Sequence, residues 1–271
     1  MSNVIIMAIA SVSGLGLICS IMLAIASKVM AVEVDERVSQ VGEIMPGANC
    51  GACGYAGCDG YANAIVNEDA ETNLCTPGGA EVSKAISSIM GVEAAATVQT
   101  YALVCCRGDS AAQHNKMEYS GIESCKAAKQ FYGGQNACVF GCLGFGDCAA
   151  VCPNNAICVD GGLARVLSAD CIGCKLCVKA CPNDIIVMEQ NAGFAAVMCM
   201  NTEKGAVVRK KCSAGCIACT KCVRECPVQA IEMRDNLAVI DYSKCTNCGK
   251  CAESCITKCI RASVPMQTTQ N

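Results

Sequence analysis

The sequence has few aromatic residues, little charge and almost no histidine. Aromatic residues make up 4% of the 271 positions, Trp is absent, and charged residues make up 17%. So few aromatics predict small modules that are stabilised by something other than a large side-chain core. The net charge of -3 argues against nucleic-acid binding, because that function requires a basic surface. With one His and no Rossmann or Walker phosphate-binding motif, the sequence offers no acid–base pair, and no direct nucleotide binding is expected.

Cysteine, in contrast, is abundant, with 28 residues or about one in ten. This density is typical of either a disulfide scaffold or a set of metal sites, and the spacing of the cysteines distinguishes the two. If the spacing favours metal, the compartment must be reducing, because thiolates are the ligands and oxidation would destroy them.

Residues 4–27 form a run without charged side chains that ends at Lys28. As a helix, this run would cover about 36 Å, more than a hydrocarbon core of about 30 Å, and it predicts a retained transmembrane anchor over residues 1–30. A cleaved signal peptide is the alternative, and the small residues at 24–26 resemble a cleavage site, but no basic residue precedes the run. Lys28 and Arg37 follow it, which predicts that the C-terminal bulk lies in the cytoplasm.

Four cysteines with the spacing C-x2-C-x4-C-x16-C begin in a glycine-rich segment at 47–58. Three ligands in one short loop and a fourth from a distant segment suit a four-iron cube, whose corners face different directions. A four-cysteine zinc site is the alternative, but the x4 gap and the density of glycine favour iron–sulfur. The segment resembles the small four-iron domain near the start of the B subunit of Rnf-type complexes, and a similar domain occurs in corrinoid iron–sulfur proteins. The predicted ligands are Cys50, Cys53, Cys58 and Cys75.

The C-terminal half contains three runs of the form C-x2-C-x2-C-x3-C and a fourth run with wider gaps. Bacterial ferredoxins bind pairs of four-iron clusters with this run, and the fourth Cys of each run serves the other cluster of the pair. Pro follows the last Cys in three runs, whereas Ile256 takes its place in the final run. Disulfides explain such repeated Cys-x2-Cys pairs poorly, and zinc ribbons lack the third closely spaced cysteine of each run. The predicted ligand sets are Cys138, Cys142, Cys148 and Cys181; Cys171, Cys174, Cys177 and Cys152; Cys216, Cys219, Cys222 and Cys255; and Cys245, Cys248, Cys251 and Cys226.

Eight cysteines remain outside these five predicted [4Fe-4S] sets. A free Cys commonly behaves as a small buried hydrophobe, and no sixth cluster is expected from them. Cys212 is a rival ligand, but the run that begins at Cys216 already supplies a complete set. The eight are Cys19, Cys105, Cys106, Cys125, Cys158, Cys199, Cys212 and Cys259.

The predicted fold is α+β, with a single N-terminal transmembrane helix, a small mostly helical four-iron domain and two tandem ferredoxin-like double-cluster modules. Gaps of equal length separate Cys152 from Cys171 and Cys226 from Cys245, and both gaps resemble hairpins. The expected boundaries are an anchor at 1–30, a four-cysteine domain at 31–92, a connecting segment at 93–137, a module at 138–190, a linker at 191–211, a second module at 212–265 and a tail at 266–271.

This order of parts resembles, over nearly the whole chain, the B subunit of the Rnf family of ion-translocating ferredoxin:NAD+ oxidoreductases. The resemblance implies a membrane-anchored electron-transfer protein at the bacterial cytoplasmic membrane, with other subunits of the complex as partners. It implies that the chain accepts electrons from reduced ferredoxin and relays them toward NAD+ while the complex moves Na+ or H+. The chain would then be a subunit of an oxidoreductase, but it would have no catalytic residues that make or break the bonds of a substrate.

Two alternatives to this function come from other classes. A polyferredoxin-like subunit of a membrane hydrogenase or formate-type enzyme would carry similar repeats, although such subunits normally lack the domain that contains Cys50. A corrinoid-linked methyl-transfer protein would need a cobalamin domain, for which the chain has no room. The basic residues Lys204, Arg209, Lys210 and Lys211 are either a docking face for an acidic ferredoxin or a solvated linker.

Overall fold

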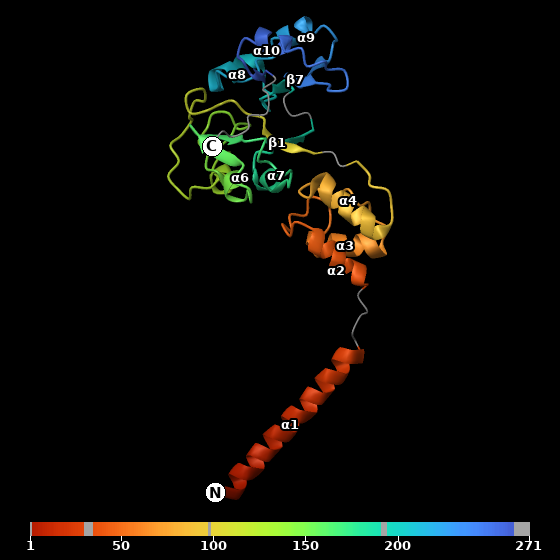
Figure 1. Cartoon of the computed structure of the whole chain (residues 1–271). Helices are drawn as coiled ribbons and strands as arrows, with labels where there is room; N and C mark the ends of the chain where they lie inside the picture. The colour runs from red at the N-terminus through yellow and green to blue at the C-terminus, as the bar shows by residue number, and fades with distance from the viewer. Residues whose placement is uncertain (1, 30–34, 97–98, 191–193, 263–271) are drawn as a thin grey trace, which may run out of the picture.

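The computed structural model describes residues 2–29, 35–96, 99–190 and 194–262. It consists of a long N-terminal helix, a small helical domain and two similar α+β modules, in that order along the chain (Figure 1). The helix extends away from the other three parts, which pack in succession.

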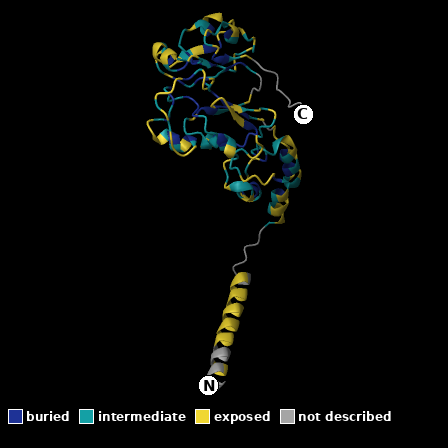
Figure 2. Cartoon of the chain, turned by 90° about the vertical axis from the view of Figure 1, so that its left-hand side faces the viewer, coloured by how far each residue is buried: buried dark blue, intermediate teal, exposed yellow. Residues whose placement is uncertain are grey.

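The N-terminal helix, α1 (Ser2–Val29), exposes all of its described side chains, among them Met7 at 74% and Leu23 at 71% (Figure 2). No helix within the described residues is both long and apolar enough to cross a membrane. The prediction of a single-pass anchor over residues 1–30, with the C-terminal bulk on the cytoplasmic side of a bacterial membrane, is therefore wrong on this criterion.

The helical domain packs three short helices around one apolar core. Val41, Tyr61 and Ile86 are each at most 1% exposed and belong to this core. The side chain of Asp35 accepts the backbone N–H of Arg37 and caps the first helix, whereas Gly91 ends the last one in the left-handed conformation at φ 68°. The helices are α2 (Glu36–Ile44), α3 (Gly57–Asn67) and α4 (Gly79–Met90).

The first α+β module is built from two antiparallel strand pairs. Its hairpin turns at Gly161 and Gly162, both at positive φ, and its other pair joins the first strand of the module to the last, with Tyr101 opposite Glu189. Pairing of the outer strands brings distant segments together around the hairpin and two short helices. The elements are β1 (Tyr101–Val104), α6 (Asp147–Ala150), β2 (Ile157–Asp160), β3 (Leu163–Val166), α7 (Leu176–Ala180) and β4 (Ile186–Glu189).

The second module repeats this arrangement. Its hairpin turns at Asp235 and Asn236, both at positive φ, as the Asp-Asn pair predicts, and its first strand again pairs with its last. The elements are β5 (Ala196–Val197), α9 (Lys221–Glu225), β6 (Ile231–Arg234), β7 (Leu237–Ile240), α10 (Lys250–Ser254) and β8 (Ile260–Arg261).

Both modules begin earlier than the expected boundaries at 138 and 212, because their first strands are separated from the cysteine runs by inserted segments. The first insert, residues 105–137, contains α5 (Cys125–Gln130), and the second, residues 198–215, contains α8 (Gly205–Lys211). The two inserts contact each other directly. The backbone N–H of His114 donates to the carbonyl of Lys211 at 3.0 Å, and the N–H of Ser213 donates to Ala112 at 2.9 Å.

The packing of the helical domain gives a first test. Because Ile86 is fully buried, Ile86→Ala is expected to lower the local free energy of unfolding by about 2–5 kcal/mol. Native-state hydrogen exchange of the amides in α2, α3 and α4 measures this change. Val92→Ala, at a position 53% exposed, is the control, and a change as large in this variant would contradict the assigned core.

Candidate iron–sulfur sites

Five cavities in the described part of the chain are lined by several cysteines each, four of them at sites 1 to 4 below and the fifth between the two α+β modules. Their empty volumes are all similar, about 310 to 380 Å³. Among the described residues, no three His, Cys, Asp or Glu side chains are placed to share a single metal ion. Sulfurs spread around a cavity suit a multi-iron cluster, in which each thiolate binds a different iron, better than they suit one zinc ion.

Site 1 lies in the helical domain, where a glycine-rich loop faces the start of α4. Asn49 accepts the backbone N–H of Cys58 at 2.8 Å and so closes the loop on itself. Gly57 is required there, because its φ is +86° and a Cβ atom would lie 2.8 Å from the Asn49 side chain. The Tyr61 hydroxyl donates to Glu71 and accepts from Leu74, which ties α3 to the segment that carries the fourth cysteine. The cysteines around this cavity are Cys50, Cys53, Cys58 and Cys75.

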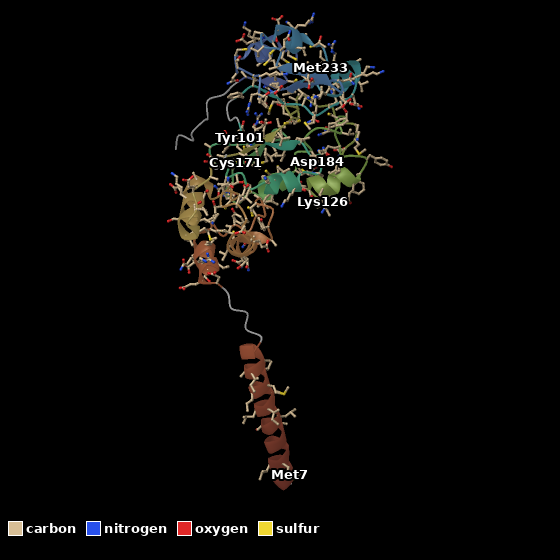
Figure 3. All side chains as sticks on the ribbon, turned by 90° about the vertical axis from the view of Figure 1, so that its right-hand side faces the viewer. Met7, Tyr101, Lys126, Cys171, Asp184 and Met233 are labelled. Carbon is tan, nitrogen blue, oxygen red and sulfur yellow. The ribbon has the colours of Figure 1, made fainter. Side chains whose placement is uncertain are left out.

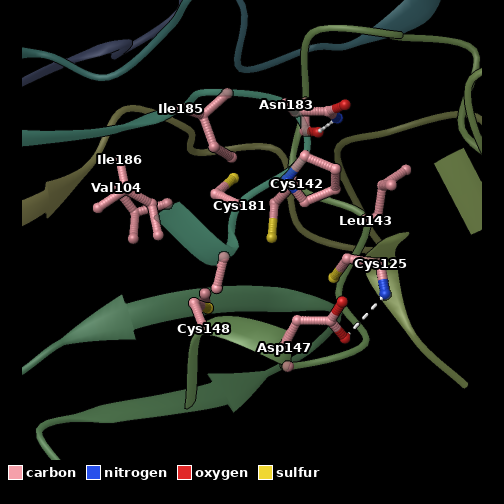
Figure 4. Close-up of a pocket in the computed structure, with 15 residues that line it drawn as sticks. Val104, Cys125, Cys142, Leu143, Asp147, Cys148, Cys181, Asn183, Ile185 and Ile186 are labelled. Carbon is pink, nitrogen blue, oxygen red and sulfur yellow. Dashed lines mark hydrogen bonds between the residues drawn. The ribbon is translucent and has the colours of Figure 1, made fainter. Parts of the chain in front are cut away.

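Site 2 lies in the first module between α6, α7 and the first insert (Figure 4). Apolar side chains of Val104, Ile185 and Ile186 form part of its wall. The structure does not bring Cys138 to this cavity, although the sequence assigned it there. Its place is taken by Cys125, at the N-terminus of α5. The cysteines around the cavity are Cys125, Cys142, Cys148 and Cys181.

The exchange of Cys138 for Cys125 has a simple cause in the spacing. The first and third cysteines of the run in the second module, Cys216 and Cys222, are six positions apart, as are Cys142 and Cys148. The run in the first module therefore begins at Cys142 and has Phe145 at its middle position. Phe145 packs on Tyr119 with ring centroids 5.5 Å apart, and α5 supplies the missing thiol from the insert. If the runs that end at Cys152 and Cys226 are aligned from these last cysteines, the sequence shows that Phe145 stands where the second module has a cysteine.

Asp147 fixes the position of Cys125. Its carboxylate accepts the backbone N–H of Cys125 at 2.9 Å (Figure 4). It also accepts the backbone N–H of Lys126 at 3.0 Å and the Ser124 hydroxyl at 2.9 Å. Burial alone would raise the pKa of Asp147, but these hydrogen bonds hold the pKa below its usual value. On the opposite side of the cavity, the Asn183 amide donates to the carbonyl of Gly141.

Site 3 joins the two halves of the first module and lies next to the helical domain. The sulfur of Cys152 accepts the N–H of Ala156 at 3.3 Å, and that of Cys171 accepts the N–H of Ala102, in β1, at 3.4 Å. Cys171 also packs against the apolar cluster that contains Tyr101 of β1, and the two residues are labelled next to each other in Figure 3. The Cys174 thiol is close enough to Cys50 of site 1 to interact with it electrostatically. The cysteines around this cavity are Cys152, Cys171, Cys174 and Cys177.

Site 4 lies in the second module and includes one cysteine more than the sequence assigned to it. Cys259, only 2% exposed, lies beside Cys216 and Cys255, and its single S–H can donate a hydrogen bond to either of them. Such a bond lowers the pKa of the thiol that accepts it, whether Cys216 or Cys255. The assigned cysteines around the cavity are Cys216, Cys219, Cys222 and Cys255.

Site 5 contains the one cysteine of the five predicted sets that is exposed, Cys248. The sulfur of Cys226 accepts the N–H of Ala230 at 3.3 Å, which repeats the bond to Cys152 in the first module, and Cys245 accepts the N–H of Asn247 at 3.4 Å. Cys251 is within electrostatic reach of Cys245 and Cys248, and Cys248 is exposed. The assigned cysteines are Cys226, Cys245, Cys248 and Cys251.

Burial makes several of these thiols poor acids. It raises the pKa of Cys148 to about 12 and the pKa of both Cys177 and Cys222 to about 11. Without metal these thiols stay protonated at neutral pH, and metal ligation must displace their protons. Iron binding is therefore expected to weaken as the pH falls.

Comparison with protein families identifies the type of cluster. Residues 45–77 match an Fe-S cluster family, and residues 170–231 and 215–259 match 4Fe-4S dicluster domains. These segments contain site 1 and three of the four ferredoxin-type runs. The chain thus carries 4Fe-4S cluster domains.

Comparison with characterised proteins covers almost the whole chain. It is 42% identical to the B subunit of the Na+-translocating ferredoxin:NAD+ oxidoreductase complex of Acetobacterium woodii, over 97% of this chain and 80% of that protein. It is 41% identical to the B subunit of the proton-translocating ferredoxin:NAD+ oxidoreductase complex of Clostridium ljungdahlii, over 97% of this chain and 94% of that protein. The B subunit of the ion-translocating oxidoreductase complex of Methanosarcina acetivorans is 39% identical over 96% of this chain and 99% of its own length.

The hydrogen bond from Cys259 gives a second test. In the metal-free chain, Cys255 should be a thiolate above about pH 5, so that iodoacetamide labels it readily at pH 7. Cys259→Ala removes the donor, and labelling of Cys255 at pH 7 should fall by about tenfold or more as its pKa moves back toward that of an ordinary thiol. Mass spectrometry of the labelled peptides over a pH series measures the shift. Cys158→Ala, at an exposed position, is the control; equal profiles for Cys255 in both variants would refute the role of Cys259.

Proposed function

Because the chain belongs to the family of B subunits of ion-translocating oxidoreductase complexes, we propose that it relays electrons from reduced ferredoxin toward NAD+ within such a complex. The translocation of Na+ or H+ is then an activity of the assembled complex. The observation that carries this proposal is the succession of cysteine-lined sites along the molecule. The chain itself makes and breaks no bonds of a substrate.

We assign five [4Fe-4S] clusters to sites 1 to 5, with Cys125 in place of Cys138 at site 2. Each ferredoxin-type module then holds two clusters, and the last cysteine of each run serves the other cluster of its pair. Cys152 at site 3 and Cys255 at site 4 are the clearest cases, since each lines a cavity together with three cysteines of the other run of its module. Cross-ligation of this kind makes each cluster depend on both halves of its module.

Contacts between sites 1 and 3 support a continuous path. The Lys175 ammonium, next to Cys174, donates to the carbonyl of Ala52 in the loop of site 1 at 3.4 Å. Gly173, at φ +70°, allows close packing there, because a Cβ atom would lie 2.6 Å from the carbonyl of Thr100 and 2.7 Å from the Thr76 methyl group. The helical domain is therefore fixed against the first module where their two sites adjoin.

The C-terminal turn of α8 is the proposed docking face for the electron donor. Arg209 and Lys210 are exposed there, whereas Lys211 is partly buried and paired with Glu203. Two free-standing basic side chains at the surface would attract an acidic ferredoxin.

The donor and its docking face can be tested together. The full chain with its clusters should be reduced by reduced ferredoxin, seen as bleaching of the iron–sulfur absorption in stopped flow. Arg209→Glu with Lys210→Glu should slow this reaction by roughly tenfold at low ionic strength, and the difference should shrink as salt is added.

The control carries the same charge change elsewhere, as Lys84→Glu with Arg165→Glu, both at exposed positions. Equal slowing in this variant would show a net-charge effect and remove α8 as the docking face. Absence of any electron transfer from ferredoxin in the wild-type chain would overturn the proposed donor.

The revised ligand set of site 2 gives a further test. Cys125→Ala should convert one cluster to a three-iron form or remove it, with a loss of between about one and four irons per chain. Iron analysis and electron paramagnetic resonance after anaerobic reconstitution measure this loss. Cys158→Ala, also outside the five sequence-assigned sets, should keep the full iron content. Retention of all iron in Cys125→Ala would contradict the assignment.

A further inference from the structure

A further cavity lies between the two modules and is lined by cysteines that no ferredoxin-type run requires. It has an empty volume of about 320 Å³, within the range of the cavities at sites 1 to 4. The first insert and the short segment between it and Cys142 supply one half of it, and the second insert supplies the other. Four of the cysteines that line it, apart from Cys105, are Cys106, Cys138, Cys199 and Cys212.

All four sulfurs accept N–H hydrogen bonds. Cys106 accepts the backbone N–H of Cys142 at 3.5 Å, and Cys199 accepts that of Cys216 at 3.4 Å. Cys138 accepts the side-chain amide of Asn201 at 3.4 Å, and Cys212 accepts backbone N–H groups from the two residues at 214–215. Sites 3 and 5 show the same N–H to sulfur bonds on their own ligands, and such bonds stabilise cluster-bound sulfur.

The four cysteines form two pairs that the internal repeat relates. Cys106 lies two positions after the end of β1, and Cys199 lies two positions after the end of β5. Cys138 precedes Cys142 by four positions, and Cys212 precedes Cys216 by four. Each module therefore offers the same pair of thiols to the cavity. Cys106 and Cys199 accept their N–H bonds from Cys142 and Cys216, and these two donors also occupy equivalent positions in the two modules.

The thiols of the two pairs face one another across the cavity. Cys138 interacts electrostatically with both Cys199 and Cys212 of the other module, and Cys106 interacts with Cys212. Cys105 also borders the cavity, but it packs in an apolar cluster with Tyr101 and Leu103. None of the described cysteines is joined in a disulfide.

We propose that Cys106, Cys138, Cys199 and Cys212 bind a sixth [4Fe-4S] cluster that bridges the two modules. This inference rests on the proposed function, since it adds a cluster to the same relay. The site is next to site 2 through the Cys142–Cys106 bond and next to site 4 through the Cys216–Cys199 bond. It therefore links the clusters of the first module to those of the second. It also lies directly beneath the proposed docking face, because Val208 of α8 forms part of its wall.

The test uses the full chain, produced and reconstituted without oxygen. Six clusters predict about 24 irons and as much acid-labile sulfide per wild-type chain, against about 20 for five. Cys199→Ala with Cys212→Ala should lose about four irons, whereas Cys105→Ala, a neighbour on the same cavity wall, should lose none. Iron and sulfide analysis, together with Mössbauer spectroscopy, gives the counts.

Two results would overturn the sixth cluster. One is a wild-type content of about 20 irons, which decides the question even if the double variant does not fold. The other is a folded double variant that keeps all its iron. Cys219→Ala separates this inference from the proposed function, because it should disturb site 4 in either case. Loss of iron in Cys219→Ala with none in the double variant would reject the bridging cluster alone, whereas a wild-type chain without iron–sulfur would reject both.

Discussion

The fold depends on the convergence of cysteine thiols from separate segments on common cavities. The sheets of both modules have only two strands each, and the strands are two to four residues long. Pairs this short are marginal in water unless something else holds them. Cysteines also make up a large part of the apolar clusters that hold these strands together. In the second module, Cys199, Cys216, Cys222, Cys251 and Cys259 make up half of the ten buried residues that pack together. Cluster binding would therefore supply much of the folding free energy.

The same constraint explains how the domains are held in order. A relay works only if neighbouring clusters are fixed at short separations, so each junction between parts must be tight. At the junction of sites 1 and 3, Gly173 permits backbone contact that any side chain would prevent. At the junction of the modules, the inserts are joined by backbone hydrogen bonds on either side of Cys212. Each junction is thus built from residues next to a proposed ligand.

The sequence predicts the parts of the molecule that follow local rules. The hairpin at Asp235 and the equivalent one in the first module come from turn chemistry, and the grouping of Cys152 with the run at 171–177 comes from the known cross-ligation of ferredoxins. The place of Cys125 at the cavity of site 2 does not follow from such rules, because Cys125 comes from the insert and the run has Phe145 where the second module has Cys219. The early start of each module could not be predicted from the sequence either, because long inserts separate β1 and β5 from the cysteine runs of their modules. The N-terminal helix α1 forms as expected, but its described residues do not meet the length and apolarity of a membrane span.

Exposure of the thiols differs along the chain in a way that suits a relay. The sulfur-bearing residues between the modules, such as Cys138 and Cys212, are buried, whereas Cys248 of site 5 is exposed. A buried cluster is shielded from oxidants in solution, and it exchanges electrons with neighbouring clusters or with a protein docked directly over it. An exposed cluster can exchange electrons with a separate protein. The burial pattern therefore makes site 5 a second place where a separate protein can exchange electrons, besides the proposed docking face on α8, and it shields the buried sites from small acceptors in solution.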